Sequence, residues 1–357
     1  MFRTTRLLAM FLVLWSAPAL AGVAPRREQS TQDVPATGLR AVRIVNPRGE
    51  VVIQPSADDQ VHVTALKLVR ANSNSEADRM SRELRVDTRV AEGQFVVEVH
   101  YPSSQSIRIG FWDLFSDFEV PSAEVRIGVQ LPPGLAVQVR CVSGDIHSHD
   151  IAGPQTLEST SGDIDVVAPA GAVAITSTSG DVTGEDLAAT TIRTVSGDVE
   201  IRGTRGPLDT HSTSGDISIR GARDSLLVGT VSGDVNVSEA PRGLEVSTTT
   251  GEIVAKRVAM RATVAASSGG VDLGLTAPLD RAQVTTSSGD IHVALGPGVG
   301  GQVEMRTSNG SLETQAAIQV GSFTRRVITG RVGQGNAVIQ LRSASGDIHL
   351  STGERDT

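Results

Sequence analysis

Between Thr194 and Asp234 the chain reads TVSGDVEIRGTRGPLDTHSTSGDISIRGARDSLLVGTVSGD, in which Ser-Gly-Asp occurs three times, 18 residues apart. The same tripeptide, or a close variant, also marks the flanking sequence, where its glycine falls at Gly144, Gly162, Gly180, Gly197, Gly215, Gly233, Gly251 and Gly269. Each step is 18 residues long, except for one of 17. Self-similarity at a fixed period is the signature of a protein built from stacked repeats.

Aliphatic residues stand at fixed distances from the repeated glycine and predict the core. The second residue after the glycine is aliphatic in every copy, from Ile146 to Ile348, and the fifth residue before it is apolar in every copy except at Thr210. Strand side chains alternate between two faces, and stacked strands lie about 4.8 Å apart, so these columns form a continuous apolar spine. The sequence therefore predicts an all-β protein, a parallel β-helix or β-solenoid with rungs of 18 residues.

A third inward column, three places before the glycine, contains only small residues, such as Cys141, Ser159 and Thr194. Small side chains predict a narrow interior beside the turn, with hydroxyl groups hydrogen-bonded along the stack or to nearby carbonyls. Cys141 is the only cysteine, which excludes an internal disulfide. We interpret it as a small core residue rather than a reactive thiol.

The Ser-Gly-Asp turns have a structural interpretation and a competing functional one. Glycine permits a positive φ at a tight corner, and Ser and Asp side chains hydrogen-bond the backbone around it. Stacked carboxylates repel one another unless they are neutralised, so calcium is the alternative, although Glu252 and Gly270 interrupt the acidic column. The turn residues in question are Gly144, Asp145, Gly162, Asp163, Gly180, Asp181, Gly197, Asp198, Gly215, Asp216, Gly233, Asp234, Gly289, Asp290, Gly346 and Asp347.

The beginning of the chain has the features of an export signal. Arg3 and Arg6 precede an apolar run from Leu7 to Trp15, and Ala19-Leu20-Ala21 supplies small residues for cleavage. Residues 1–21 are therefore predicted to be a signal peptide. No later stretch contains the roughly 20 apolar residues of a membrane helix, so we expect no transmembrane segment after cleavage. We expect an exported protein of the periplasm or the cell surface, or a secreted one.

The remaining residues divide into four parts by pattern. Residues 22–38 are polar and predict a flexible linker. Residues 39–135 predict a β-rich capping region with one short helix, starting near Glu76 behind an N-cap at Ser75. Residues 136–351 carry the solenoid repeats, and residues 352–357 form a tail. The capping region would cover strand edges that the stack otherwise leaves open.

One apolar cluster within the capping region needs a partner. Only 3% of the chain is aromatic, yet four aromatic residues fall within eight positions, next to a leucine. The cluster covers either the end of the protein's own core or a partner surface on a membrane or another protein. Its residues are Phe111, Trp112, Leu114, Phe115 and Phe118.

The sequence predicts no catalytic, cofactor-binding or metal site. The serines occupy repeated turn positions, whereas a nucleophile needs a unique base and an oxyanion pocket. His147 and His149 share one strand face without a third ligand nearby, and His147, His292 and His349 occupy equivalent outward positions, which predicts an exposed column. The net charge of −8 argues against a nucleic-acid partner.

The order of these features resembles a bacterial family of unknown function that takes its name from adhesins. The resemblance rests on Val45-Asn46-Pro47-Arg48-Gly49-Glu50-Val51, on Leu131-Pro132-Pro133-Gly134, and on the repeated Ser-Gly-Asp-Ile/Val. It implies a β-solenoid in the cell envelope and supplies no catalytic residues. Some relatives are linked to envelope-stress signalling, which implies a second role.

Two functional hypotheses remain open, with a third more remote. The protein is either a non-catalytic adhesin or binding scaffold that contacts a glycan or a protein, or a regulatory or structural partner of an envelope protein in the periplasm. The aromatic cluster would be the docking point in the second case. The remote alternative is a polysaccharide-active β-helix enzyme, which would need longer loops than the regular repeat leaves room for.

Overall fold

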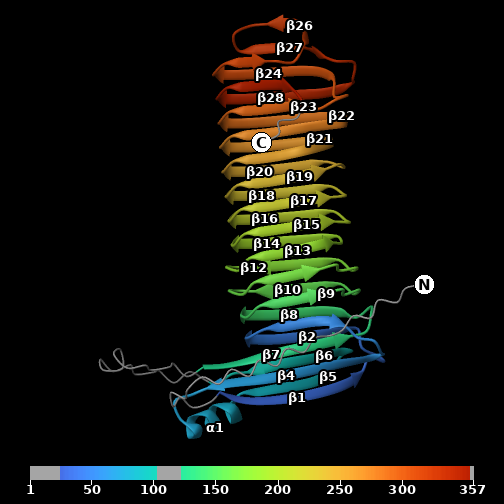
Figure 1. The fold of residues 1–357 in the computed structure, drawn as a ribbon, viewed down its shortest axis with the longest axis vertical. Coiled ribbons are helices and arrows are strands. Elements are labelled where there is room, and N and C mark those ends of the chain that lie inside the picture. Colours follow the sequence, from blue (N-terminus) through green and yellow to red (C-terminus); the bar gives the residue numbers. More distant parts are fainter. Residues whose placement is uncertain (1–24, 103–121, 354–357) are drawn as a thin grey trace, which may run out of the picture.

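The computed structural model describes residues 25–102 and 122–353, and this part of the chain forms one elongated stack of strands (Figure 1). The strands run across the long axis of the molecule, and all of them belong to one continuous hydrogen-bonded sheet. The predicted all-β solenoid with a β-rich N-terminal region is therefore confirmed.

Each central rung contains two strands that flank the Ser-Gly-Asp turn. The strands before the turn are β8 (Ala136–Ser143), β10 (Gln155–Ser159), β12 (Val173–Ser177), β14 (Thr190–Ser196), β16 (Leu208–Ser214), β18 (Leu226–Ser232) and β20 (Leu244–Thr250). The strands after it are β9 (Ile146–His149), β11 (Ile164–Val167), β13 (Val182–Leu187), β15 (Val199–Thr204), β17 (Ile217–Ala222) and β19 (Val235–Ala240). The next two rungs are continued by the long strands β21 (Ile253–Ser268) and β22 (Val271–Ser288).

Equivalent positions of successive rungs pair in parallel and in register. Ile164 lies opposite Ile146 on one side and opposite Val182 on the other. The columns predicted to face inward are buried accordingly: Ile164 and Leu157 are fully buried, and the exceptional Thr210 also faces the core. Files of like side chains along the stack therefore form the apolar interior.

The N-terminal region continues the stack and then closes it with antiparallel strands. Strands β2 (Ala41–Arg48) and β3 (Val51–Pro55) pair in parallel with β8 and β9, so they form a first rung. The strands beyond them are β1 (Arg26–Pro35), β4 (Gln60–Arg70), β5 (Arg85–Ala91), β6 (Gln94–His100) and β7 (Ser122–Leu131). Strand β4 pairs antiparallel with both β1 and β7.

The prediction of a flexible linker over residues 22–38 is wrong for Arg26–Pro35, which form strand β1. This strand pairs with β4 along its whole length. Its residues are almost all exposed, so an apolar alternation that would have indicated a strand is absent from the sequence. Backbone hydrogen bonds to β4 hold it instead, and its charged residues protect the open edge from further pairing.

The predicted helix is present as α1 (Asn74–Glu83), but its N-cap differs from the prediction. Ser73, rather than Ser75, is the cap, and its hydroxyl accepts a hydrogen bond of 3.2 Å from the Glu76 amide. Ser73 and Ser75 are two residues apart at the start of the helix, and serine is a favoured N-cap, so the sequence alone does not separate them. The helix buries Ala77 and Ser81 beside the end of the stack.

At the C-terminal end, the spatial order of the strands departs from the order of the sequence. Strand β28 (Ala337–Ser345) lies between β22 and β24 (Gly301–Asn309), and it pairs in parallel with both. Strand β29 (Ile348–Thr352) likewise lies between β23 (Ile291–Leu295) and β25 (Leu312–Thr314). The antiparallel strands β27 (Val327–Val332) and β26 (Ile318–Phe323) finish the stack (Figure 1).

Candidate functional site

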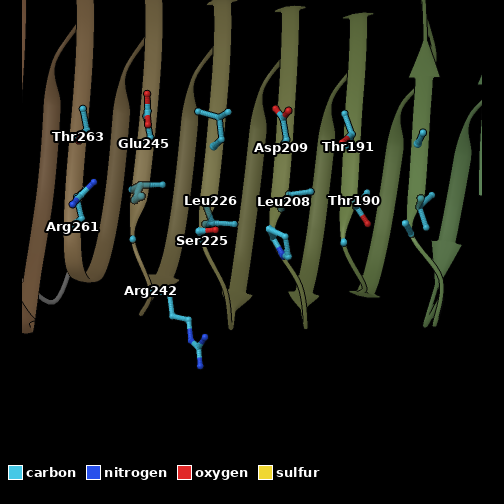
Figure 2. A pocket seen from close by; sticks show the side chains of 18 of the residues that line it. Thr190, Thr191, Leu208, Asp209, Ser225, Leu226, Arg242, Glu245, Arg261 and Thr263 are labelled. Carbon is cyan, nitrogen blue, oxygen red and sulfur yellow. The ribbon is translucent and has the colours of Figure 1, made fainter. Parts of the chain in front are cut away.

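A shallow groove of about 850 Å³ runs along the outside of the stack and is the best candidate for a binding site. It crosses the beginning of each pre-turn strand from β10 to β20 and continues over β21 to Asp280 of β22. Figure 2 shows neighbouring strands contributing side chains to it in parallel rows. Because stacked strands lie about 4.8 Å apart, the groove is roughly 30 Å long.

The groove combines an apolar floor with polar and charged side chains. Its floor contains core residues at the start of each strand, such as Leu208 and Leu226. Leu227 and Met260 are 38% and 41% exposed. The polar lining includes hydroxyl, carboxylate and guanidinium groups, namely Thr156, Thr190, Thr191, Asp209, Ser225, Arg242, Glu245, Arg261, Thr263 and Asp280.

The backbone along the groove is already paired. Thr191, for example, lies opposite Ala174 on one neighbouring strand and opposite Asp209 on the other. A ligand in the groove is therefore recognised through side chains rather than by adding a strand to the sheet. The sequence analysis missed this groove because its lining comes from the variable side of each rung, and only the stacking joins these residues into one surface.

The turn carboxylates form a ladder of hydrogen bonds along the stack. The backbone amide of each turn donates to the Oδ1 atom of the Asp one rung earlier, at 2.7–3.0 Å, in a series that runs from Asp145 through Asp163, Asp181, Asp198, Asp216 and Asp234 to Glu252. Amide donors stabilise the charged form of a carboxylate. The ladder accounts for the stacked aspartates without a cation, and calcium binding stays an untested alternative.

The turn glycines are required mainly by the contact between rungs. A Cβ atom added to Gly215 would overlap the carbonyl oxygen of Gly197, and Gly162 and Gly144 are related in the same way. Gly215 also has a φ of +141°, whereas Gly162 does not adopt a positive φ. The prediction that glycine supplies a positive φ at these corners is therefore incomplete, because the carbonyl of the previous rung also occupies the space that a side chain would need.

The small inward column is buried as predicted, but many of its hydroxyl groups lack partners. Ser177 bonds both the amide and the carbonyl of Gly180, at 3.1 Å each. The prediction that the other hydroxyls are also hydrogen-bonded is wrong for a series of buried side chains, namely Thr194, Ser212, Thr230, Thr248 and Thr286. At these five positions the narrow interior requires a small side chain, and a hydrogen bond from its hydroxyl is not required. Burial raises the pKa of the Cys141 thiol in the same column to about 12.

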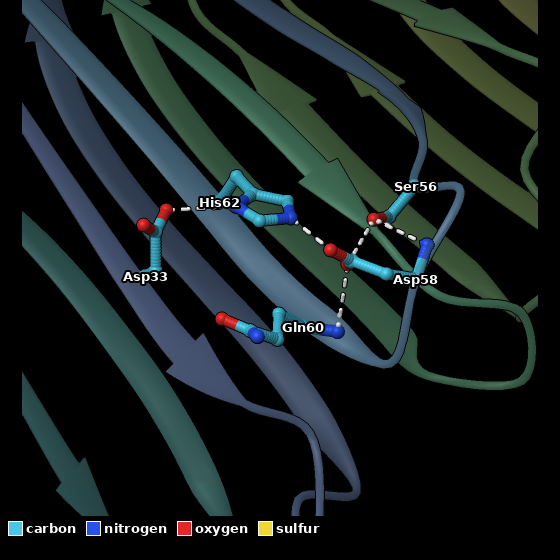
Figure 3. A network of polar contacts seen from close by, with 5 residues as sticks. All are labelled: Asp33, Ser56, Asp58, Gln60 and His62. Atoms are coloured by element: carbon cyan, nitrogen blue, oxygen red, sulfur yellow. Dashed lines mark hydrogen bonds and ion pairs between the residues drawn. The ribbon is translucent and has the colours of Figure 1, made fainter.

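A second polar cluster connects the N-terminal strands. His62 of β4 contacts Asp33 of β1 through Nδ1 at 2.7 Å and Asp58 through Nε2 at 2.9 Å (Figure 3). The Ser56 hydroxyl donates to Asp58 Oδ1 at 2.9 Å, so a carboxylate separates the serine from the histidine. The two carboxylates raise the pKa of His62. The arrangement joins β1 to β4 and does not activate Ser56 as a nucleophile.

Several sequence-based predictions remain predictions. The aromatic cluster Phe111, Trp112, Leu114, Phe115 and Phe118 lies outside the described residues, as does the signal peptide. No helix within residues 25–102 and 122–353 has the length and apolar character to cross a membrane. Over the same residues, no three His, Cys, Asp or Glu side chains are grouped as metal ligands.

The fold and its repeats define a parallel β-solenoid with an antiparallel N-terminal end. The chain belongs to the Toastrack DUF4097 family, whose model matches residues 41–260 and 238–351. A comparison with curated proteins finds no match.

Solved structures of low sequence identity align over most of the chain. A provisionally named lipid-binding protein of Parabacteroides distasonis is 13% identical, with 93% of this chain and 98% of that chain covered and a TM-score of 0.39. A provisionally named adhesin of Bacteroides fragilis is 12% identical, with 91% and 97% covered and a TM-score of 0.24. A provisionally named cell adhesion protein of Clostridium sporogenes is 8% identical, with 92% and 100% covered and a TM-score of 0.21.

Proposed function

We propose that this protein is an exported, non-catalytic binding scaffold of the cell envelope, and that its groove holds an extended glycan strand. The groove across successive rungs is the observation that carries the proposal, because its repeated lining suits a polymer rather than a compact molecule. The predicted signal peptide supports export to the periplasm or the cell surface.

The chemistry of the lining favours a glycan over an extended peptide. Strand-like peptides gain much of their affinity from a free sheet edge, and the groove strands offer none. Sugar hydroxyls pair instead with hydroxyl, carboxylate and guanidinium groups such as those of Thr191, Glu245 and Arg242. Exposed aliphatic surface at Leu227 and Met260 contacts the apolar faces of the sugar rings.

A substitution that fills the groove tests the proposal. Ala174 is exposed on β12 within the groove, so Ala174→Trp blocks the path of a polymer without entering the core. Ala265 is an exposed alanine outside the groove, and Ala265→Trp is the matched control. Co-sedimentation with peptidoglycan sacculi and affinity electrophoresis in lipopolysaccharide or linear β-glucan measure binding.

Retention of the wild type and of Ala265→Trp on one of these polymers, with loss for Ala174→Trp, supports the proposal. Equal retention of both variants, or no retention of the wild type on any polymer, contradicts it. Release of new reducing ends from a bound polymer would instead favour the polysaccharide-active enzyme.

A further inference from the structure

Four side chains that bear metal-binding groups lie in one row near the C-terminal end of the stack. His292 of β23 lies opposite His349 of β29, because the C-terminal strands are inserted between earlier ones. Asp272 lies opposite His292 on the next strand, and Glu313 lies opposite His349 on the far side. The row therefore places two imidazoles between two carboxylates, on four consecutive strands.

The two imidazole rings are close and incompletely hydrogen-bonded. Their centroids are 6.0 Å apart, and the rings are tilted by 41°. His292 Nδ1 and His349 Nε2 are both buried and have no hydrogen-bond partner among the described residues. An unpaired polar atom that is removed from water destabilises the fold. Unlike the hydroxyls of the inward column, both atoms here are imidazole nitrogens, so a metal ion is a partner that satisfies both at once.

His147 occupies the equivalent outward position near the other end of the stack and shows the contrast. Its Nε2 atom lies 3.8 Å from Glu50 Oε1, and its Nδ1 atom lies 3.8 Å from Asp165 Oδ2. Both ring nitrogens thus face carboxylates, and no second imidazole lies on either neighbouring strand. The pair of unpartnered ring nitrogens is specific to His292 and His349.

We propose that His292 and His349 bind a divalent transition-metal ion such as Zn²⁺ through one ring nitrogen each. Imidazole nitrogens bind zinc at about 2.0–2.1 Å, which places the centres of two rings that share an ion roughly 5–6 Å apart. The observed separation of 6.0 Å is in this range.

The two imidazoles are the protein ligands of this site, since no third metal-binding side chain is grouped with them among the described residues. Glu313 lies on the far side of His349, where its Oε2 atom is 3.7 Å from His349 Nδ1, so it contacts the ring nitrogen that the ion leaves free. A carboxylate at this position orients the ring and favours a cation. Water fills the remaining positions, and the carboxylate of Asp272 adds favourable charge from the next strand.

The site also has a structural consequence. A shared ion links β23 directly to β29, and therefore ties the inserted C-terminal layer to the rung beneath it. An ion that binds the folded chain and not the unfolded chain raises the free energy of unfolding, by an amount that grows with the logarithm of the free ion concentration above the Kd.

Isothermal titration of the untagged chain with Zn²⁺, at about pH 7.5 where free imidazole is mostly neutral, tests the proposal. We expect one strong site in the wild type. His292→Gln and His349→Gln each weaken binding by more than about tenfold, because each removes one of two nitrogen ligands. His147 occupies the equivalent position but has no second imidazole beside it, so His147→Gln leaves the zinc affinity unchanged.

Two further measurements exclude a trivial loss of binding through misfolding. Circular dichroism and the melting temperature without metal show whether each variant retains the fold, and X-ray absorption of the wild-type zinc complex counts its imidazole ligands. Two imidazoles support the proposal. An absorption spectrum with oxygen ligands alone, no zinc binding by the wild type, or equal affinity of the wild type and folded His292→Gln would overturn it.

Discussion

The backbone amide of Asp347 donates a hydrogen bond of 2.8 Å to Asp290 Oδ1, although the two residues are 57 positions apart. The next bond of this ladder runs from the Ser311 amide to Asp347 Oδ1, at 2.7 Å. The turn ladder therefore continues through the C-terminal end in spatial order rather than in sequence order. The same type of bond that joins successive repeats also fixes the place of the inserted layer.

Replacement of Asp290 tests this role. Asp290→Ala removes the acceptor and leaves the Asp347 amide unpaired, whereas Asp290→Asn keeps an oxygen acceptor and removes only the charge. We expect the Asp347 amide to exchange with deuterium about fivefold faster in the alanine variant than in the asparagine variant, which corresponds to the loss of one net hydrogen bond. Equal exchange rates in the two variants would show that the ladder does not hold this layer.

The contact between glycines of successive rungs predicts that alanine destabilises the protein at some turn glycines and not at others. Gly215→Ala places a methyl group against the Gly197 carbonyl and is expected to lower the free energy of unfolding by about 1–3 kcal/mol. Gly270→Ala is the control, since an added Cβ there meets nothing closer than 3.9 Å. Urea denaturation measures both, and a similar loss in both variants would contradict the explanation.

The unpartnered threonine hydroxyls offer a route to higher stability. Thr230 Oγ1 is buried without a hydrogen-bond partner, so Thr230→Val replaces it with a methyl group of similar size and is expected to stabilise the fold by about 1 kcal/mol. Thr307 Oγ1 donates to the Gly346 carbonyl at 3.0 Å, and Thr307→Val should destabilise by a similar amount. Thermal unfolding distinguishes the two, and a lower melting temperature for Thr230→Val would refute the prediction.

The thiol of Cys141 should be inert in the folded protein. The residue is buried, and burial, with a smaller contribution from the charge of Asp145, raises its pKa to about 12. A thiol reagent at about pH 8 is expected to react only as the protein unfolds, because the thiolate is the nucleophile. Val142→Cys in a Cys141→Ser background moves the thiol to the exposed neighbour and should react at once. Comparable labelling rates for the two proteins would be evidence against this assignment.

The contact of His62 with Asp33 and Asp58 predicts a pH dependence at the N-terminal edge. Hydrogen bonds to Asp33 and Asp58 raise the pKa of His62 above 6.5, so its contribution is complete below pH 6.5 and is lost as the pH rises through the raised value. The hydrogen bond from His62 lowers the pKa of Asp58 below 3.8, so its contribution is present above pH 3.8 and is lost as the pH falls. The whole contact is therefore strongest between about pH 3.8 and pH 6.5, and the bond between His62 and Asp33, which attaches β1 to β4, weakens as the pH rises above this range.

Hydrogen exchange of the β1 amides, corrected for the intrinsic effect of pH, measures this attachment. Protection in the wild type should fall as the pH rises above the window, while His62→Gln should show a weaker dependence. A profile that is identical in the two proteins would remove His62 from the explanation.

The periodic part of the fold is readable from the sequence, because the glycine and the aliphatic columns report the same 18-residue repeat. Parallel pairing in register, as between Ile146 and Ile164, follows from that repeat. The order of layers at the C-terminal end does not follow, because the Gly346 turn has the same sequence pattern as the others, and only the structure places Gly346 against the Gly289 carbonyl and Gly310 against the Gly346 carbonyl. Strand β1 was hidden by its exposure on both faces.

The candidate site was less predictable than the fold. The groove consists of residues that share no type from rung to rung, such as Ala174, Thr191 and Asp209, so no column identifies it. The row of His292 and His349 was recognised as a column, but the two residues become neighbours only through the inserted layer. The sequence separation of His292 and His349 indicated that they were far apart, whereas the spatial order of the C-terminal strands makes them neighbours.

The interleaved C-terminal end also constrains how the protein is made. Residues 337–352 leave the ribosome after strands β24 to β27, yet they occupy the layer between β24 and β22. The earlier rungs can assemble one after another during synthesis. Strands β24 to β27 can join the stack only after residues 337–352, which lie between them and the earlier rungs, have been translated. Addition or removal of whole repeats should accordingly be tolerated in the middle of the stack and not at this end.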